Sequence, residues 1–355
     1  MSRARRWVRR GLVGGVGALG GLVGVVTSVG WFLSGPAHVG PVSDHFDGDV
    51  FLNTEDTPMP DLARGLRMLR EGRGPAWATR PVAPQPPPPE RVYGDAMRAT
   101  FVNHATVLVQ HDGVNVLTDP IWSERCSAVQ WAGPARHHVP GVAMEELPPI
   151  DVVLISHNHY DHLDVDTLRA LARRDDPVLV VPLGNGPLAR ALGFSEVIEL
   201  DWRETVTARG LRITGEEVRH FSSRGLFDRN RTLWMGFSIE GTEAGRWYFA
   251  GDTGFGEHFA DTGRARGPFR LALLPIGAYA PRWFMGPIHM DPDQAVQAHL
   301  AVGAQQSVGV HFGTFQLTRE AQDAPVEELA RARTARGVAD DAFVALLPGQ
   351  GLDVR

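Results

Sequence analysis

The sequence S-H-N-H-Y-D-H-L-D, which occupies residues Ser156 to Asp164, contains four potential metal ligands within six positions. They are His157, His159, Asp161 and His162. An apolar run from Val152 to Ile155 precedes them and predicts a buried strand, and the residues after Asp164 predict a helix. Residues two apart on a helix face different ways. We therefore place the four side chains on a loop between strand and helix, where they can point to one side.

Imidazole and carboxylate ligands without a thiolate are typical of zinc and related first-row ions. A catalytic zinc ion usually has three protein ligands and one open position. Four ligands in a single loop exceed that number, so we predict two ions that share further ligands from elsewhere in the chain. The alternative, a polar surface loop, is disfavoured by the strand and helix predicted on either side.

The same stretch resembles the H-x-H-x-D-H signature of the metallo-β-lactamase fold hydrolases. Further segments resemble one branch of that superfamily, the N-acyl-phosphatidylethanolamine-hydrolysing phospholipases D. These segments are 104–106, 117–120, 251–254, 275–279, 281–285 and 311–315. The resemblance extends from about Asp44 to the C-terminus. It implies a zinc-dependent phosphodiesterase in which a hydroxide that bridges two metal ions releases phosphatidate and N-acylethanolamine from a phospholipid.

The resemblance also implies seven ligands for two Zn2+ ions, or for other first-row divalent ions. The first ion is expected to be held by imidazoles alone: His157, His159 and His220. The second ion is expected to be held by a mixed set: Asp161, His162 and His311. Asp252 is expected to bridge the two ions, since a carboxylate between two dications offsets their repulsion.

Every expected ligand outside the loop follows a predicted strand, so one edge of a sandwich can bring them together. Each also has a structural alternative. His220 can be a surface histidine, Asp252 between glycine and threonine can form a turn, and His311 can be a buried histidine with satisfied hydrogen bonds.

Other residues receive roles from the resemblance and from their position. Besides Asp161, His289 is expected to be catalytic, in phosphate binding or in acid–base chemistry, with a helix-capping neighbour as the alternative. Asp119 is expected to orient a ligand histidine. His104 either lines the site or simply packs. The apolar run Trp283, Phe284 and Met285 either belongs to the core or forms a wall for an acyl chain.

The order of predicted elements indicates an α/β protein with the metallo-β-lactamase αββα sandwich. Strands are expected at 100–110 and 114–118 around Asp112-Gly113, a hairpin signal. A second hairpin is expected at 233–239 and 246–250. Strands first pair as hairpins and then alternate with helices, twice over. This pattern fits two mixed sheets packed face to face with helices outside.

Composition excludes some classes of function. The chain has 355 residues, a net charge of −6 and one cysteine, Cys126. The acidic balance argues against nucleic-acid binding, which needs a basic surface. A single cysteine excludes an internal disulfide and a cysteine-cluster metal site. All basic residues other than histidine are arginine, so Schiff-base chemistry and a P-loop lysine are excluded as well.

Four regions are expected along the chain. Residues 1–10 form a basic tail, 11–35 a transmembrane anchor, 36–91 a lead-in with a proline-rich linker, and 92–355 the catalytic domain. The uncharged stretch 11–35 is long enough to cross a bilayer. With the arginines on the cytoplasmic side, it predicts a single-pass protein of a bacterial inner membrane with an extracytoplasmic catalytic domain. A cleaved signal, a twin-arginine export signal and a cytoplasmic site are the alternatives.

The partners that follow are a phospholipid substrate and the membrane bilayer, without nucleic acid, and the oligomeric state is left open. Two other functions compete with the phosphodiesterase. The first alternative is an enzyme with the same metal centre that cleaves a lactone or another ester bond, as a lactonase or esterase on the same fold does. The other is a membrane-attached metal-binding module without turnover, which has no need of seven ligands around an open site.

Overall fold

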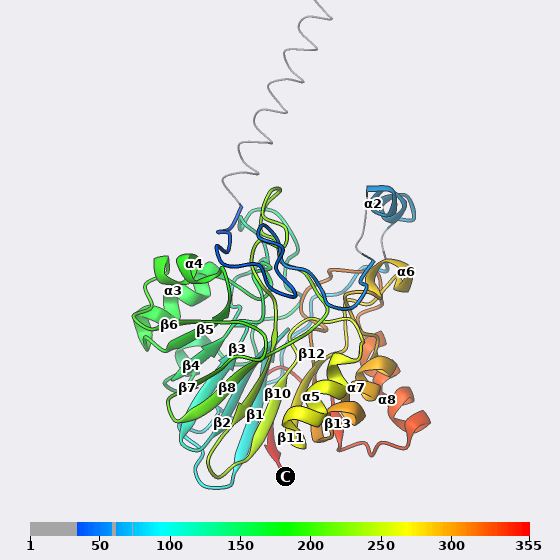
Figure 1. The fold of residues 1–355 in the computed structure, drawn as a ribbon. Helices are drawn as coiled ribbons and strands as arrows, with labels where there is room; N and C mark the ends of the chain where they lie inside the picture. Colours follow the sequence, from blue (N-terminus) through cyan, green and yellow to red (C-terminus); the bar gives the residue numbers. More distant parts are fainter. Residues whose placement is uncertain (1–33, 59–61, 73) are drawn as a thin grey trace, which may run out of the picture.

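Two seven-stranded β-sheets pack face to face in the computed structural model, which describes residues 34–58, 62–72 and 74–355 (Figure 1). Each sheet is mixed. It begins with antiparallel strands and continues with parallel ones, as the order of hairpins and helices predicts.

The first sheet has the strand order β14-β1-β2-β3-β4-β5-β6. Its strands are β1 (Met97–Asn103), β2 (Thr106–His111), β3 (Val114–Thr118), β4 (Val152–Leu154), β5 (Val178–Pro182), β6 (Val197–Leu200) and β14 (Gly351–Val354). Strands β3 to β6 run parallel, and β4 and β5 are buried along their whole length. Burial on both faces explains why these two strands are apolar without alternation.

The second sheet has the order β13-β12-β11-β10-β9-β8-β7. Its strands are β7 (Thr205–Ala208), β8 (Leu211–Glu216), β9 (Gly236–Glu240), β10 (Arg246–Phe249), β11 (Phe269–Pro275), β12 (Ala304–Val310) and β13 (Phe343–Val344). The predicted hairpin of β9 and β10 is present and antiparallel. Strands β10 to β13 run parallel.

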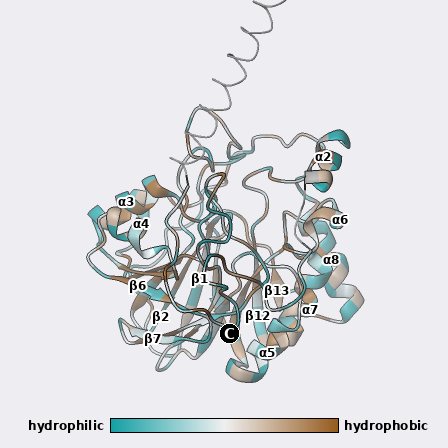
Figure 2. Cartoon of the chain, turned by 45° about the horizontal axis from the view of Figure 1, so that its top comes forward, coloured by the Kyte–Doolittle hydropathy of each residue, from teal (hydrophilic) through white to brown (hydrophobic). Residues whose placement is uncertain are grey.

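Helices cover the outer face of each sheet, which gives four layers (Figure 1). The helices are α2 (Leu62–Arg70), α3 (Val165–Arg174), α4 (Gly186–Ala191), α5 (His258–Arg266), α6 (Arg282–Met285), α7 (Pro292–Val302) and α8 (Ala324–Arg336), with a short 3-10 turn at Met144–Glu146. Helices α3 and α4 pack on the first sheet, and α5, α7 and α8 pack on the second. The helices carry hydrophilic and hydrophobic residues together in Figure 2, as covering helices do.

The ends of α7 show how local sequence sets the helix boundaries. The side chain of Asp291 accepts a hydrogen bond from the backbone N–H of Gln294 at 2.9 Å, and Pro292 occupies the first turn. The helix stops at Gly303, whose φ of 68° lies in the left-handed region. The sequence predicts a helix from Asp291 to Val302, and the structure has α7 at Pro292–Val302 with Asp291 as its N-cap.

One predicted strand is corrected. The run 100–110 is expected to be continuous, but it divides into β1 and β2, which pair antiparallel across a turn at His104. The backbone of His104 has a φ of 46°, which ends the strand. This turn directs the His104 side chain to the end of the sandwich rather than along a sheet face.

The expected single-pass membrane anchor is contradicted. In the described part of the chain, no helix combines the length and apolar character needed to cross a bilayer. The longest helix there, α8, has 13 residues, whereas about 20 are needed. Residues 11–33 of the predicted anchor lie outside the described residues. We therefore withdraw the transmembrane helix and the single-pass, inner-membrane localisation with its extracytoplasmic domain. The other domain boundaries stay predictions.

Candidate metal centre

The predicted ligands meet at the C-terminal ends of strands from both sheets. Residues 157–162 follow β4, His220 follows β8, Asp252 follows β10 and His311 follows β12. Strands β8, β10 and β12 point the same way, because β8 and β10 are both antiparallel to β9 and β10 to β12 are parallel. Their C-terminal ends therefore share one edge of the sandwich, and the structure brings all seven predicted ligands together there.

Three imidazoles form the first group. The Nε2 atom of His157 lies 2.8 Å from Nδ1 of His159, and Nε2 of His220 lies 3.3 Å from the same Nδ1. All three ligand nitrogens lie within 4.8 Å of one another. This is the set that the resemblance implies for the first ion.

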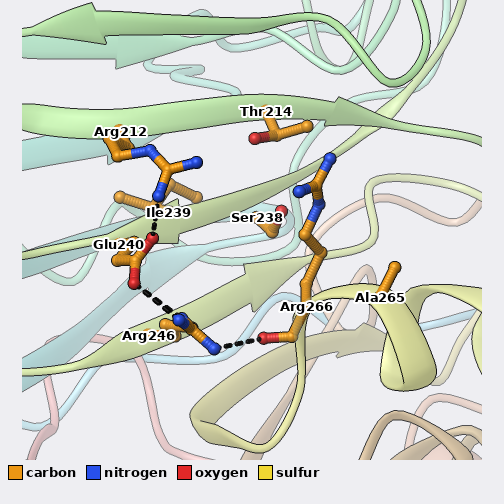
Figure 3. A pocket seen from close by; sticks show the side chains of 8 residues that line it. All are labelled: Arg212, Thr214, Ser238, Ile239, Glu240, Arg246, Ala265 and Arg266. Carbon is orange, nitrogen blue, oxygen red and sulfur yellow. Dashed lines mark hydrogen bonds and ion pairs between the residues drawn. The ribbon is translucent and has the colours of Figure 1, made fainter.

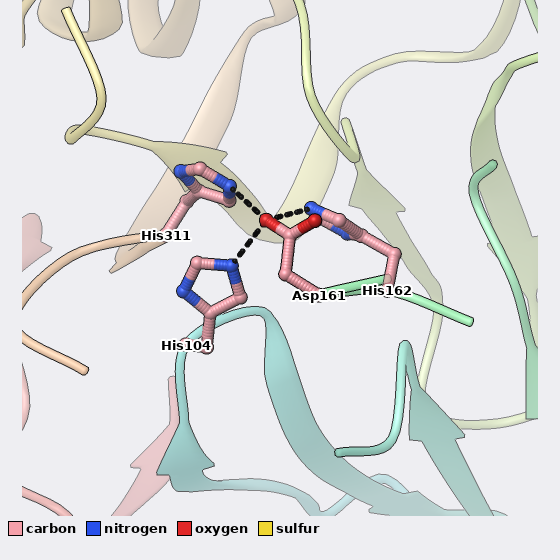
Figure 4. A group of neighbouring side chains, drawn as sticks. All are labelled: His104, Asp161, His162 and His311. Atoms are coloured by element: carbon pink, nitrogen blue, oxygen red, sulfur yellow. Dashed lines mark hydrogen bonds and ion pairs between the residues drawn. The ribbon is translucent and has the colours of Figure 1, made fainter. Parts of the chain in front are cut away.

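A carboxylate surrounded by imidazoles forms the second group (Figure 4). Oδ2 of Asp161 lies 2.9 Å from Nε2 of His104 and 3.3 Å from Nε2 of both His162 and His311. The sequence left two roles open for His104, and the structure places its ring in this group. The other three residues are the set expected for the second ion.

Asp252 lies between the two groups. Its Oδ2 atom is 3.2 Å from Nε2 of His162 and 3.1 Å from Nε2 of His311, both in the second group. It is 3.9 Å from Nε2 of His220 in the first group. This carboxylate thus lies near imidazoles of both groups, and its role as a bridging ligand stays a prediction.

The charges of the centre favour a cation. Burial lowers the pKa of His159 to about 3 and that of His220 to about 4, so both imidazoles are neutral and offer lone pairs. Burial also acts on His311, but the Asp252 and Asp161 carboxylates outweigh it and raise its pKa to about 9. The two carboxylates thus stabilise a positive charge next to them. Metal ions could supply that charge in place of the protonated imidazole.

The donor set fits divalent metal ions. Seven oxygen or nitrogen ligands are available without a thiolate, as first-row ions of borderline softness prefer. The Oδ1 atom of Asp252 and the Nδ1 atom of His289 are buried and have no hydrogen-bond partner in the described part of the chain. Buried polar groups are normally paired, and two unpartnered atoms at this place fit a site that holds an ion or another bound group.

Asp119 contacts both ends of the metal loop, residues 156–162, and its role in orienting a ligand histidine stays a prediction. One carboxylate oxygen accepts a hydrogen bond from Nδ1 of His162 at 2.6 Å and another from the Ser156 hydroxyl at 2.6 Å. The other oxygen accepts from the Ser156 backbone N–H at 2.7 Å. Asp119 is fully buried. It therefore fixes the ring orientation of His162 and leaves Nε2 free for a metal.

We expect Asp119→Asn to weaken metal binding by about 10- to 100-fold, the usual effect of losing the partner of a ligand histidine. An amide nitrogen in place of the oxygen would face two donors, from His162 and Ser156. Competition with a coloured chelator measures the affinity. Asp176→Asn, which changes an exposed carboxylate in the loop between α3 and β5, is the control. Equal affinities for both variants would exclude the orienting role of Asp119.

Arg224 contacts the metal loop as well, although no sequence motif predicts this contact. Arg224 donates hydrogen bonds to the backbone oxygens of Asn158 at 2.8 Å and Leu163 at 2.9 Å. Its guanidinium lies 4.1 Å from the ring centroid of Tyr160. An arginine in a loop 60 residues away has no motif of its own, so only the structure identifies it.

Backbone strain gathers at this edge. Three residues of the centre that are not glycine have φ in the left-handed region: 46° for His104, 33° for Asp119 and 61° for His311. Each such conformation costs on the order of 1–3 kcal/mol and persists where the surrounding structure enforces it. All three follow directly on a strand end, and the turn aims the side chain at the centre.

His289 and the apolar run before it lie beside the centre. Nδ1 of His289 is 4.0 Å from Oδ2 of Asp252, and its ring centroid is 5.1 Å from that of His220. Met285 is buried, whereas Trp283 and Phe284 are half-buried on α6. The Arg67 guanidinium of α2 covers the Trp283 ring at 3.9 Å. An acyl-chain role for this run stays a prediction.

A polar pocket lies elsewhere in the molecule, away from the histidine-rich edge (Figure 3). It lies on strands β8 to β10 and the end of α5. Glu240 pairs with Arg212 at 2.8 Å and with Arg246 at 2.7 Å, and Arg266 pairs with Glu216 at 3.3 Å, so each of its arginines already has a carboxylate partner. Its lining includes no histidine. We therefore assign the chemistry to the histidine-rich edge.

The fold and the site together define a class of protein. Residues 114–312, more than half of the chain, match the family model of the Beta-lactamase superfamily domain. The chain belongs to this superfamily, in its metallo-β-lactamase fold, and it is a metal-dependent hydrolase. A solved structure, Igni18, a metallo hydrolase from Ignicoccus hospitalis, has the same fold. It aligns with a TM-score of 0.54 and 21% identity over 73% of this chain and 99% of its own.

Two relatives within the superfamily are similar to this chain over most of its length. N-acyl-phosphatidylethanolamine-hydrolyzing phospholipase D 1 of Caenorhabditis elegans is 40% identical over 265 residues, which cover 71% of this chain and 74% of the relative. An uncharacterised protein of Mycobacterium tuberculosis is 39% identical over an alignment of 366 residues, which covers 99% of this chain and 92% of the relative. The similarity to the phospholipase confirms the resemblance that the sequence motifs indicate.

Proposed function

We propose that this hydrolase is a phosphodiesterase of the phospholipase D type, which cleaves N-acyl-phosphatidylethanolamine-like phospholipids. The observation that carries the proposal is the pair of histidine-rich groups joined by Asp252, at an edge formed by both sheets. The 40% identity to a phospholipase of this specificity supports the substrate class.

In this proposal the centre would hold two zinc ions. His157, His159 and His220 would hold one, and Asp161, His162 and His311 would hold the other. Asp252 would serve as a ligand shared by the two sites. When bound, two such ions stabilise negative charge on a phosphoryl oxygen and lower the pKa of a water molecule toward neutrality. The neutral imidazoles of the first group and the ionised carboxylates supply the ligand atoms without a large cost of deprotonation.

The chain's own residues determine where the phosphodiester sits. Burial lowers the pKa of His289 well below its usual value, so the ring is neutral. Its Nδ1 atom lies near Asp252 and has no hydrogen-bond partner among the described residues. We assign His289 to the phosphate, as a hydrogen-bond partner of a phosphate oxygen. The neighbouring Trp283 and Phe284 are assigned to an acyl chain.

The reaction balances as a hydrolysis. The oxygen of a water molecule forms a bond to phosphorus, and the bond between phosphorus and the oxygen of the N-acylethanolamine breaks. One water proton ends on that leaving oxygen. The products are phosphatidate and a free N-acylethanolamine.

The proposal is tested with mixed micelles that contain N-acyl-phosphatidylethanolamine and ordinary phospholipids. After incubation with zinc-loaded protein, lipid mass spectrometry is expected to detect phosphatidate and free N-acylethanolamine in equal amounts. Asp161→Asn is expected to lose this activity, because the second group loses its central carboxylate. Asp166→Asn, an exposed carboxylate on α3, is the matched control and should retain it.

A zinc-loaded protein that yields no lipid product, but hydrolyses a lactone or ester, would contradict the phosphodiesterase proposal and leave the metal centre in place. Wild-type turnover by Asp161→Asn would contradict the metal centre itself.

A further inference from the structure

A short segment of the lead-in, residues 53–57, lies against the candidate metal centre although the matched domain begins only at residue 114. Its first residue, Asn53, pairs with the backbone of His220. The side-chain Nδ2 donates to the His220 carbonyl oxygen at 2.9 Å, and Oδ1 accepts from the His220 N–H at 3.1 Å. One amide side chain thus satisfies both polar backbone groups of a residue that lies beyond the end of β8.

This pairing determines where the His220 ring can point. The ring's Nδ1 donates to the carbonyl oxygen of Ile288 at 3.1 Å, and Nε2 faces Nδ1 of His159 at 3.3 Å. The backbone of His220 is therefore held by Asn53 and its ring by Ile288. If Asn53 is replaced, the segment after β8 loses the two hydrogen bonds that hold the His220 backbone in position next to the centre.

The residues next to Asn53 tie the lead-in to the same place. The Glu55 carboxylate accepts a hydrogen bond from the Glu257 backbone N–H at 2.8 Å and pairs with Arg219 at 3.2 Å. The Arg219 guanidinium also donates to the carbonyl oxygen of Asp56 at 3.0 Å. The residue before His220 is thus attached to the lead-in through its side chain.

Arg219 also connects the lead-in to the segment that follows Asp252. Its backbone N–H donates to Oγ1 of Thr253 at 3.0 Å, and its carbonyl oxygen accepts from the N–H of Gly254 at 2.9 Å. Thr253 and Gly254 directly follow Asp252. The lead-in, the His220 segment and the Asp252 segment therefore form one hydrogen-bonded unit.

We propose that Asn53 is a positioning residue of the metal centre, which sets the His220 imidazole for the ion held by His157, His159 and His220. The inference rests on the ligand set of the proposed function. It implies that the centre is incomplete without the lead-in, so the functional unit is larger than the matched superfamily domain.

The test is metal binding by the full chain carrying Asn53→Ala. Titration with Zn2+ against a competing chelator is expected to give one ion bound as in the wild type and a second bound about 10- to 100-fold more weakly. In protein loaded with Co2+, the visible absorption bands are expected to change, because one imidazole leaves its position. A residue that only supports the fold would lower the unfolding temperature and leave these bands unchanged.

His45→Ala is the matched control on the same lead-in. The His45 ring attaches the lead-in to the sandwich: its Nε2 atom lies 2.7 Å from the Asp201 carboxylate, and its centroid lies 4.5 Å from that of the Trp202 ring. Among the described contacts of His45, none is with a candidate ligand. This variant is expected to unfold at a lower temperature but to bind both ions with wild-type affinity and spectrum. A second variant, Asn53→Asp, keeps the acceptor and removes the donor, and an intermediate loss of affinity is expected.

Wild-type affinity and spectrum in both Asn53 variants would overturn the inference and leave the proposed function standing. The same weakening in His45→Ala as in Asn53→Ala would also overturn it, because general loosening of the lead-in would then explain the effect. A wild-type chain that binds no metal would overturn the proposed function and the inference together.

Discussion

Asp252→Asn is expected to lower the rate of phospholipid hydrolysis by at least about a thousandfold, which corresponds to about 4 kcal/mol of transition-state stabilisation. The carboxylate lies within 3.1–3.9 Å of imidazoles from both ligand groups. Asparagine keeps the shape of the side chain and removes its charge. Two dications would then face each other without the anion that offsets their repulsion.

The same variant is expected to retain one bound metal ion at most under conditions in which the wild type binds two. Elemental analysis after gel filtration measures this, together with the rate of phosphatidate release. Asp261→Asn on α5 is the control, because its carboxylate is exposed and away from the ligand groups. Two ions and a wild-type rate in Asp252→Asn would exclude the bridging role.

Trp247→Ala is expected to produce the largest loss of stability. The Trp247 side chain is fully buried between the sheets, and its Nε1 donates to Nε2 of His111 at 2.9 Å. Trp247 belongs to β10 of the second sheet and His111 to β2 of the first, so the bond joins the two sheets. The cavity costs about 3–5 kcal/mol, and the orphaned acceptor on His111 adds about 1–3 kcal/mol.

Together these losses approach the whole stability of a typical domain, about 5–15 kcal/mol. Urea unfolding followed by circular dichroism measures the change in the free energy of unfolding. Trp247→Phe is the matched variant, which fills most of the cavity and removes only the hydrogen bond. It is expected to lose about 1–3 kcal/mol. A loss below about 2 kcal/mol in Trp247→Ala would contradict a central role of this contact between the sheets.

The fold could be predicted from the sequence, and so could the meeting of the candidate ligands at one edge, because the signals for both are local. The stretch 156–164 places four ligands between a predicted strand and a predicted helix, and the structure has β4 before it and α3 after it. His220, Asp252 and His311 each follow a strand, and strands that point the same way end at one edge. The joint position of these residues therefore follows from topology.

Other features depend on contacts between distant residues, which no local pattern contains. Arg224 braces the metal loop from about 60 positions away, and Asn53 pairs with His220 across 167 positions. His104 enters the centre because its left-handed backbone breaks a run that reads as one strand. The short edge strands β7, β13 and β14 have few residues and weak alternation, so packing rather than sequence defines them.

The membrane anchor is a feature that the sequence predicts and that the structure does not support. An uncharged stretch of sequence predicts a span by its length and composition alone. The described residues contain no helix that meets both requirements. The proposed reaction needs only that a phospholipid reach the histidine-rich edge, so it does not depend on such an anchor.

The most direct test of the account follows the oxygen atom that hydrolysis adds. The reaction is run in water enriched in 18O with N-acyl-phosphatidylethanolamine in mixed micelles, and both products are analysed by mass spectrometry. The account predicts one 18O atom in the phosphate group of phosphatidate and none in the N-acylethanolamine, because water attacks phosphorus at the metal centre. Label in the N-acylethanolamine, or release of free fatty acid in place of phosphatidate, would contradict it.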